Sequence, residues 1–148
     1  MIYRGSRDGF TNAIFHLRCD GKGPTLVIFK TTKGRICGGY TEEVWETPLT
    51  NKWKQDSKAF LFSIDLLAAY PVADSSKTIY CCADFGPYFG NCDLGIHGDP
   101  LNGKDNGYCR TGKNFNVPTD IDENSEITGE LYKFTLADIE VYQIKEIQ

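Results

Sequence analysis

The chain has 148 residues, a formal net charge of −4 and 41% hydrophobic residues, values typical of one folded domain with its own core. The acidic balance argues against broad nucleic-acid binding, which depends on Lys and Arg side chains that neutralise phosphates. No apolar run approaches the ~20 residues of a membrane span, and the amino-terminal MIYRGSRDGF lacks the apolar centre of a secretory signal. We therefore expect a cytoplasmic protein without membrane insertion, with reduced thiols and a single domain over residues 1–148.

The first element in chain order is a helix in the segment TNAIFHLRCDGKG, residues 11–23. Thr11 or Asn12 can cap its amino-terminal end, because their side chains accept hydrogen bonds from free backbone N–H groups. Gly21 can end the helix, since glycine readily adopts the left-handed conformation found after many helices.

Short runs of apolar, aromatic and β-branched residues then predict strands separated by turns. The run at residues 26–29 is continuously apolar, which predicts a strand buried on both faces. A turn at residues 32–34 leads into a returning strand at 35–40, and further strands are expected at 59–64 and 78–83.

Residues 42–57 contain both tryptophans, Trp45 and Trp53, among polar side chains. We interpret this segment as irregular and held to the surface by its aromatic rings. A second helix is expected within residues 42–58 or 64–70.

Residues 84–129 are rich in glycine and polar side chains, which predicts short strands, one of them at 93–97, joined by long loops. The carboxyl-terminal part predicts strands at 131–134 and 139–144 with a corner at 136–138. Several antiparallel strands, glycine turns and one clear helix favour a mainly β fold. The expected architecture is a two-sheet antiparallel β-sandwich with one or two short flanking helices.

Three of the six cysteines lie in YCCADFGPYFGNCDLGIHG, residues 80–98, and raise the question of a metal or redox site. Structural zinc sites usually have two closely spaced ligand pairs, and the chain contains no C-x-x-C. We therefore expect no metal or other cofactor, and thiols that behave as small hydrophobic side chains. Cys92 has His97 five residues further on and is a candidate redox thiol, because a neighbouring base can activate a cysteine.

Two other ligand motifs are incomplete. The acidic segment at residues 120–124 begins like a calcium-binding loop, but its twelfth position is Leu131 instead of Glu. A loosely bound cation there remains an alternative to a solvated acidic loop. The Gly-Lys pairs in DGKGPT and TGKN do not complete a phosphate-binding P-loop.

Two groups of residues are candidates for partner binding. Trp45 and Trp53 lie in polar, turn-rich sequence, where they can anchor a partner, although Trp45 can instead pack as an end cap of the sandwich. Arg4, Arg7 and Asp8 in RGSRDG can contact a ligand or, alternatively, fix a turn through charged hydrogen bonds to nearby backbone.

Six segments, taken in order, carry a resemblance that extends over nearly the whole chain. They are YRGSRDGF, FHLRCDGKGPTL, RICGGYTEEVW, FLFS, FGPYFGNCDLGI and IEVYQI. Together they resemble the TLDc domain of oxidation-resistance proteins, which also occurs in some nuclear-receptor coactivator and Rab-GAP-like proteins. The form with YRGSRDGF and a terminal IEVYQI is similar to stand-alone or kelch- and BTB-linked versions common in protists, so the chain is expected to be a minimal protein or a fragment.

The resemblance implies a β-sandwich of two antiparallel sheets flanked by short helices, in agreement with the pattern of the elements. It also implies shared positions: Gly38, Gly39, Trp45, Gly86, Phe89, Gly90, Asp93 and Leu94. Cys109 falls near a cysteine that some members carry before a T-F-G-N segment, which is TGKN at residues 111–114 here. By this resemblance Cys109 becomes a second candidate redox thiol.

The family implies protein–protein binding, because several eukaryotic members bind the peripheral sector of the V-type proton ATPase and members are linked to protection from oxidative stress. We therefore expect a non-enzymatic interaction module that docks on a large assembly such as this ATPase, in the cytoplasm beside an endomembrane proton pump or a cilium. The alternatives are a structural component of a ciliary or cytoskeletal assembly, a thiol-based redox protein, and a metal-dependent enzyme.

Overall fold

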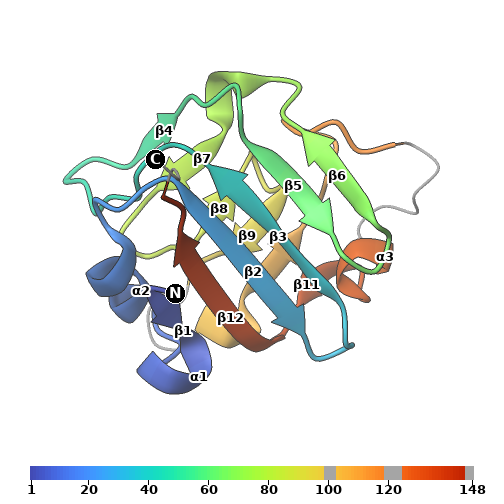
Figure 1. Cartoon of the computed structure of the whole chain (residues 1–148), viewed down its shortest axis with the longest axis horizontal. Coiled ribbons are helices and arrows are strands. Elements are labelled where there is room, and N and C mark those ends of the chain that lie inside the picture. Colours follow the sequence, from blue (N-terminus) through green and yellow to red (C-terminus); the bar gives the residue numbers. More distant parts are fainter. Residues whose placement is uncertain (99–102, 119–124, 146–148) are drawn as a thin grey trace.

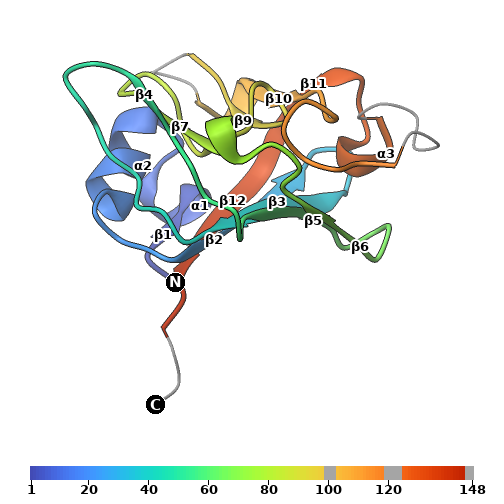
Figure 2. The same ribbon diagram turned by 90° about the horizontal axis from the view of Figure 1, so that it is seen from above.

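Two antiparallel β-sheets pack face to face around one apolar core, with the helices at the ends of the sandwich (Figures 1 and 2). The computed structural model describes residues 1–98, 103–118 and 125–145. Within these residues each sheet has six strands, and every helical segment is short. The mainly β two-sheet sandwich predicted from the sequence is therefore confirmed.

The first sheet lies at the front of Figure 1 and has the order β1-β12-β2-β3-β5-β6. Its strands are β1 (Tyr3–Arg4), β12 (Leu136–Gln143), β2 (Thr25–Thr31), β3 (Ile36–Thr41), β5 (Phe60–Ser63) and β6 (Ala68–Pro71). The pairing of β12 with β2 shifts register between Leu136 and Asp138. The corner expected at residues 136–138 is therefore a bulge-like irregularity within β12. It does not separate two strands.

The second sheet lies behind the first and has the order β11-β10-β9-β8-β7-β4. Its strands are β11 (Tyr132–Phe134), β10 (Gly107–Cys109), β9 (Leu94–Ile96), β8 (Tyr88–Phe89), β7 (Ile79–Cys81) and β4 (Lys52–Lys54). Strand β4 falls in the segment interpreted as irregular. Its sequence Lys-Trp-Lys is too short to show an apolar alternation, and it forms by pairing with β7.

The one clear helix is present as α2 (Asn12–Cys19), and Thr11 caps it by accepting a hydrogen bond from the backbone N–H of Ile14. The second helix expected at 42–58 or 64–70 is wrong, because those segments contain β4 and β6. The other helical segments are single turns: α1 (Gly5–Asp8), α3 (Ser125–Thr128), and the 3-10 turns η1 (Ser75–Lys77) and η2 (Gly103–Asp105). No helix in the described ranges is long and apolar enough to cross a membrane.

Strand β2 is buried on one face only, which corrects the prediction from its continuous apolar run. Val27 and Phe29 have no exposed surface, whereas Leu26 and Ile28 are partly exposed. Because neighbouring side chains in a strand point to opposite faces, the second pair lies on the outside of the sheet. The strand therefore contributes apolar side chains both to the core and to the surface.

Two adjacent glycines in β3 allow close packing on both faces of the first sheet. A Cβ on Gly39 would stand 2.7 Å from the ring of Phe89, which enters the core from β8 of the second sheet. A Cβ on Gly38 would meet the ring of Phe62 at 2.8 Å on the opposite face. Gly38 and Gly39 thus let an aromatic ring lie against the backbone on each side.

Candidate functional site

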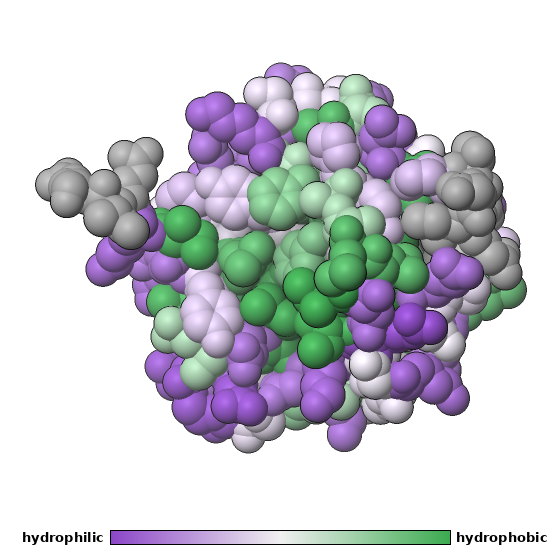
Figure 3. Space-filling model, turned by 45° about the vertical axis from the view of Figure 1, so that its right-hand side comes forward, coloured by the Kyte–Doolittle hydropathy of each residue, from purple (hydrophilic) through white to green (hydrophobic). Residues whose placement is uncertain are grey.

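The outer face of the first sheet carries partly exposed apolar side chains from three neighbouring strands. This surface, called the first outer face below, consists of Leu26, Ile28, Ile36, Tyr40, Phe60 and Phe62. The Tyr40 and Phe60 rings stack with centroids 5.2 Å apart, and Phe62 lies over Gly38. Figure 3 shows a hydrophobic area on this side of the molecule, bordered by hydrophilic residues. Contiguous apolar surface of this kind marks interaction sites in soluble proteins.

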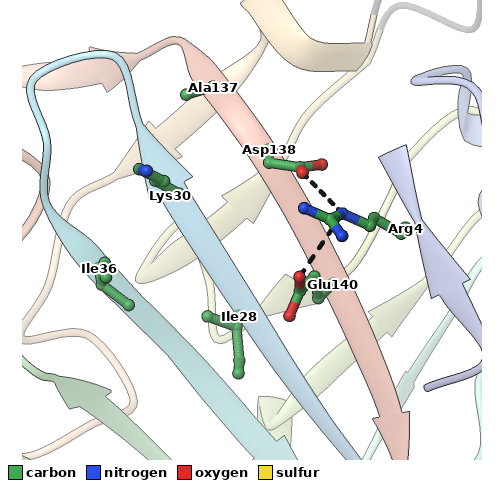
Figure 4. Close-up of a pocket in the computed structure, with 7 residues that line it drawn as sticks. All are labelled: Arg4, Ile28, Lys30, Ile36, Ala137, Asp138 and Glu140. Carbon is green, nitrogen blue, oxygen red and sulfur yellow. Dashed lines mark hydrogen bonds and ion pairs between the residues drawn. The ribbon is translucent and has the colours of Figure 1, made fainter. Parts of the chain in front are cut away.

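A pocket of about 380 Å³ adjoins the first outer face, between β1, β12, β2 and β3 (Figure 4). Ile28 and Ile36 supply its apolar lining, and Arg4 lies over β12 on the other side. Arg4 Nε is 3.0 Å from Asp138 Oδ2 and 3.6 Å from a Glu140 carboxylate oxygen. The pocket therefore joins a hydrophobic surface to a fixed charge cluster.

Asp138 is the centre of this charge cluster. Besides Arg4 it accepts hydrogen bonds from the backbone N–H and the hydroxyl of Ser6, at 3.0 and 2.7 Å. Burial raises the pKa of Asp138, but the hydrogen bonds from Ser6 and Arg4 outweigh burial and lower the pKa below its usual range. Arg4 is thereby positioned at the surface by its partners, while its side chain stays 45% exposed and open to contact.

Lys30 lines the same pocket and is exposed. Within the described part of the chain it makes no ion pair, unlike Arg4 across the pocket. The pocket thus places an ammonium group outside the Arg4 charge cluster and beside the isoleucines, which suits a partner that brings an acidic residue next to an apolar one.

Arg7 and Asp8, also predicted for binding, fix the turn of α1. Asp8 accepts a bidentate hydrogen bond from Arg7 at 2.9 and 2.8 Å and another from the backbone N–H of Arg4 at 3.0 Å. These bonds, that from Arg7 first, lower the pKa of Asp8 to about 2. The geometry matches the turn-fixing alternative for this pair, whereas Arg4 points to the pocket.

The two tryptophans have different surroundings. Trp45 has no exposed surface and donates a hydrogen bond from Nε1 to Thr25 Oγ1 at 3.0 Å, so it lies in the core and not at a binding surface. Trp53 is partly exposed on β4 and packs on Tyr80 with ring centroids 4.6 Å apart. Of the two predicted anchors, only Trp53 is accessible to a partner.

Most of the other positions implied by the resemblance have structural surroundings. Phe89 and Leu94 are buried and point inward. A Cβ on Gly86 would stand 2.9 Å from Ile96, so this glycine also permits close packing. Asp93 has no exposed surface, and its carboxylate accepts hydrogen bonds from the backbone N–H groups of Lys113 and Asn114 at 3.0 and 2.8 Å.

The TGKN segment is therefore anchored by Asp93. Asn114 in turn accepts a hydrogen bond from the backbone N–H of Asn91 at 2.9 Å and donates one to the carbonyl of Asp74 at 3.1 Å. Burial is the main influence on Asp93 and raises the pKa of its carboxyl to about 6. The network joins three loops at one end of the sandwich and has a structural role.

None of the six cysteines forms a disulfide, and only Cys92 is partly exposed. Cys109 has no exposed surface, and burial raises the pKa of its thiol well above the ordinary value, which leaves it protonated and unreactive. Cys92 Sγ accepts a hydrogen bond from the Tyr88 hydroxyl at 2.9 Å. Among the described residues no group of three or more His, Cys, Asp or Glu side chains is arranged to hold a metal ion. The acidic segment at 120–124 lies outside them.

The sequence did not point to the first outer face. Its residues were assigned to strands, but a strand prediction does not give the register that brings them together. The available signal was the run of apolar residues at 26–29. A strand with one face in the core and one in water normally alternates apolar and polar residues, so the apolar residues on its outer face indicated an apolar surface.

Comparison with known proteins gives short matches to two curated proteins. The chain is 41% identical over 46 residues to "MTOR-associated protein MEAK7" of Danio rerio, an alignment that covers 31% of this chain and 10% of that protein. It is 33% identical over 45 residues to "TBC1 domain family member 24" of Xenopus tropicalis, covering 30% of this chain and 8% of that protein. The matched segment thus spans a tenth or less of the length of either relative.

The family comparison covers far more of the chain. The sequence model of the TLDc domain matches residues 1–145, which include all six segments that carried the resemblance. The fold agrees with the sandwich that this resemblance implied. The chain belongs to the TLDc domain family.

Proposed function

We propose that this TLDc chain is a non-enzymatic docking module that binds a large protein assembly through the first outer face. The observation that carries the proposal is the group of apolar side chains on β2, β3 and β5 that no other part of the described structure covers. Burial of such a surface against a partner is favourable in proportion to the apolar area removed from water. Arg4 and Lys30 at its border add polar contacts that set orientation.

The V-type proton ATPase is the proposed assembly, because membership of the TLDc family implies binding to its peripheral sector. The match to a protein whose name records association with mTOR supports protein binding in general. Under this proposal any part in protection from oxidative stress comes through the partner, because five of the six thiols are buried.

Capture of the peripheral sector by the immobilised chain tests the proposal. Ile36→Asp places a carboxylate within the first outer face and is expected to abolish capture, since the charge must be desolvated on binding. Leu17→Asp is the matched control, because Leu17 is 80% exposed on α2, away from this face. Capture that survives Ile36→Asp, or no capture by the wild-type chain, contradicts the proposal.

A further inference from the structure

The outer face of the second sheet carries a continuous row of aromatic side chains, which is distinct from the first outer face. This aromatic row consists of Trp53, Tyr80, Phe85, Tyr88, His97 and Tyr108. Successive ring centroids are 4.6 Å apart for Trp53 and Tyr80, 5.3 Å for Tyr80 and Phe85, and 4.5 Å for Phe85 and His97. His97 and Tyr108 follow at 6.2 Å. All except Tyr88 are at least partly exposed.

The strand register produces the row from residues that are far apart in sequence. Trp53 of β4 lies opposite Tyr80 of β7, and Gly95 of β9 lies opposite both Tyr88 of β8 and Tyr108 of β10. A Cβ on Gly95 would stand 2.7 Å from the Tyr88 ring, so the absence of a side chain at this position leaves room for the ring. The row therefore crosses five strands, from β4 to β10.

Three of the accessible rings carry a hydrogen-bond donor that has no partner among the described residues. The Trp53 indole N–H and the hydroxyls of Tyr80 and Tyr108 make no hydrogen bond to any described residue, whereas the buried Tyr88 hydroxyl donates to Cys92. A surface of this kind offers flat apolar faces together with free N–H and O–H groups. It suits a ligand that presents apolar rings and carbonyl acceptors.

A lysine side chain lies at each end of the row. Lys77 Nζ lies 5.6 Å from the Trp53 ring centroid, and Lys133 lies opposite Tyr108 in the register of β10 and β11. Neither makes an ion pair within the described residues. Asp105 lines the pocket that contains Lys133, and Asp74 interacts electrostatically with Lys77, but Lys77 is the lysine that lies over a ring of the row. An acidic residue of a partner is therefore best accommodated beside Trp53.

We infer that the aromatic row binds a proline-rich segment of a partner protein in the polyproline II conformation, with an acidic residue at the Trp53 end. Polyproline II has no internal hydrogen bonds, and proline lacks an N–H, so such a segment presents rings and carbonyl acceptors only. Aromatic-lined faces recognise such segments in other domains. The proline rings of such a segment can pack on the aromatic rings of the row. Its carbonyl groups can accept hydrogen bonds from the Trp53 indole N–H and from the hydroxyls of Tyr80 and Tyr108.

The dimensions also agree. Adjacent strands are about 4.8 Å apart, so two strand spacings measure about 9.6 Å. One turn of polyproline II contains three residues at about 3.1 Å each, or about 9.3 Å. The accessible rings at the two ends of the row, Trp53 of β4 and Tyr108 of β10, are four strand spacings apart in the sheet order, or about 19 Å. This distance corresponds to about two turns of polyproline II, or about six residues.

Binding of a labelled peptide by fluorescence anisotropy tests the inference. The peptide has about six prolines with glutamates at one end, and the control peptide replaces the prolines by glycine and serine. The wild-type chain is expected to bind the proline peptide and not the control peptide. Trp53→Ala is expected to weaken binding about tenfold, the effect of losing one anchor, and Lys77→Gln to weaken it severalfold only when the glutamates are present.

Matched variants separate binding from folding. Tyr108→Phe keeps the ring and removes only the unpartnered hydroxyl, so it is expected to weaken binding with unchanged stability. Tyr40→Ala removes a tyrosine from the first outer face and is expected to leave peptide affinity unchanged. Equal affinity for the two peptides, equal affinity of Trp53→Ala and wild type, or tighter binding of an oligothymidine that stacks on the same rings would overturn the inference. Because it concerns a different surface, its failure leaves the docking function proposed above intact, and the reverse also holds.

Discussion

Gly90 lies directly beneath the carboxylate of Asp93, because a Cβ on Gly90 would stand 2.0 Å from Asp93 Oδ2. Gly90 also has a φ of +66°, in the left-handed region that side chains other than glycine rarely adopt. Gly90 and Asp93 are therefore one structural unit, in which the glycine makes room for a buried carboxylate that holds the TGKN loop.

Substitution of Gly90 by alanine tests this unit. The added methyl group must displace the Asp93 carboxylate in addition to straining the backbone, so we expect the free energy of unfolding to fall by about 3 kcal/mol. Gly34→Ala is the matched control, because Gly34 has a φ of +80° but a Cβ there would meet nothing within 4 Å. It is expected to lose only about 1 kcal/mol. Urea denaturation followed by circular dichroism measures both, and equal losses would show that Asp93 is not displaced.

Asp93→Asn is expected to change how stability depends on pH. Burial raises the folded-state pKa of Asp93 to about 6, above the ~3.9 of an unfolded aspartate. The folded chain therefore binds more protons between these values, and this carboxyl makes stability fall as pH rises from about 4 to about 6. Asn cannot titrate, so the stability lost through the substitution should be larger at pH 4.5 than at pH 6.5. A loss that is independent of pH across this window would contradict the raised pKa.

The sequence predicted the sandwich because its longer strands carry enough apolar and β-branched residues to be recognised locally. It failed where an element depends on tertiary partners. Strand β4 forms because it pairs with β7, and α1 is a single turn held by the carboxylates of Asp8 and Asp138. A four-residue helix has no periodicity to read, so neither element has a local signal.

The candidate surfaces were harder to predict than the fold for the same reason. Trp53 was recognised as an accessible anchor from its polar surroundings. The members of the aromatic row, however, are distant in sequence, and Trp53 and Tyr108 are more than fifty residues apart. Their proximity is a matter of register, which depends on the whole sheet. Trp45 has equally polar neighbours in sequence and is nevertheless in the core, since the sequence does not show which ring the sheets enclose.

Thiol labelling separates the docking proposal from the redox alternative. Cys92 is the one partly exposed cysteine, while burial raises the pKa of Cys19 and Cys37 to about 12 and that of Cys109 well above its ordinary value. A thiol that stays protonated is a poor nucleophile, so in the native chain a single cysteine is expected to react quickly with a disulfide reagent at pH 8. Cys92→Ser should remove that fast phase, and denaturant should expose the other thiols. Fast labelling of Cys109 in the folded chain would restore it as a redox candidate.

His16 is surrounded by three oxygen acceptors and is expected to make stability depend on pH. Its Nδ1 lies 2.7 Å from Asp20 Oδ1, and its Nε2 lies 2.9 and 2.8 Å from the backbone carbonyls of Cys82 and Phe85. All three groups accept hydrogen bonds, so both ring nitrogens must donate, as only the protonated imidazolium does. Burial opposes the charge, but the hydrogen bonds and the charge of Asp20 outweigh it and raise the pKa of His16.

Stability is therefore expected to fall as pH rises above neutrality. The contribution of His16 is fully present below the unfolded-state pKa of about 6.5 and is lost as pH passes through the higher folded-state pKa, with a slope of at most about 1.4 kcal/mol per pH unit. Denaturation of wild type and His16→Gln from pH 6 to pH 9 measures this loss as a difference. The buried thiols, whose raised pKa values also reduce stability at high pH, are common to both proteins and cancel. Asp20→Asn should move the loss to lower pH because it removes the countercharge, and a wild-type minus His16→Gln difference that stays constant with pH would rule out a protonated His16.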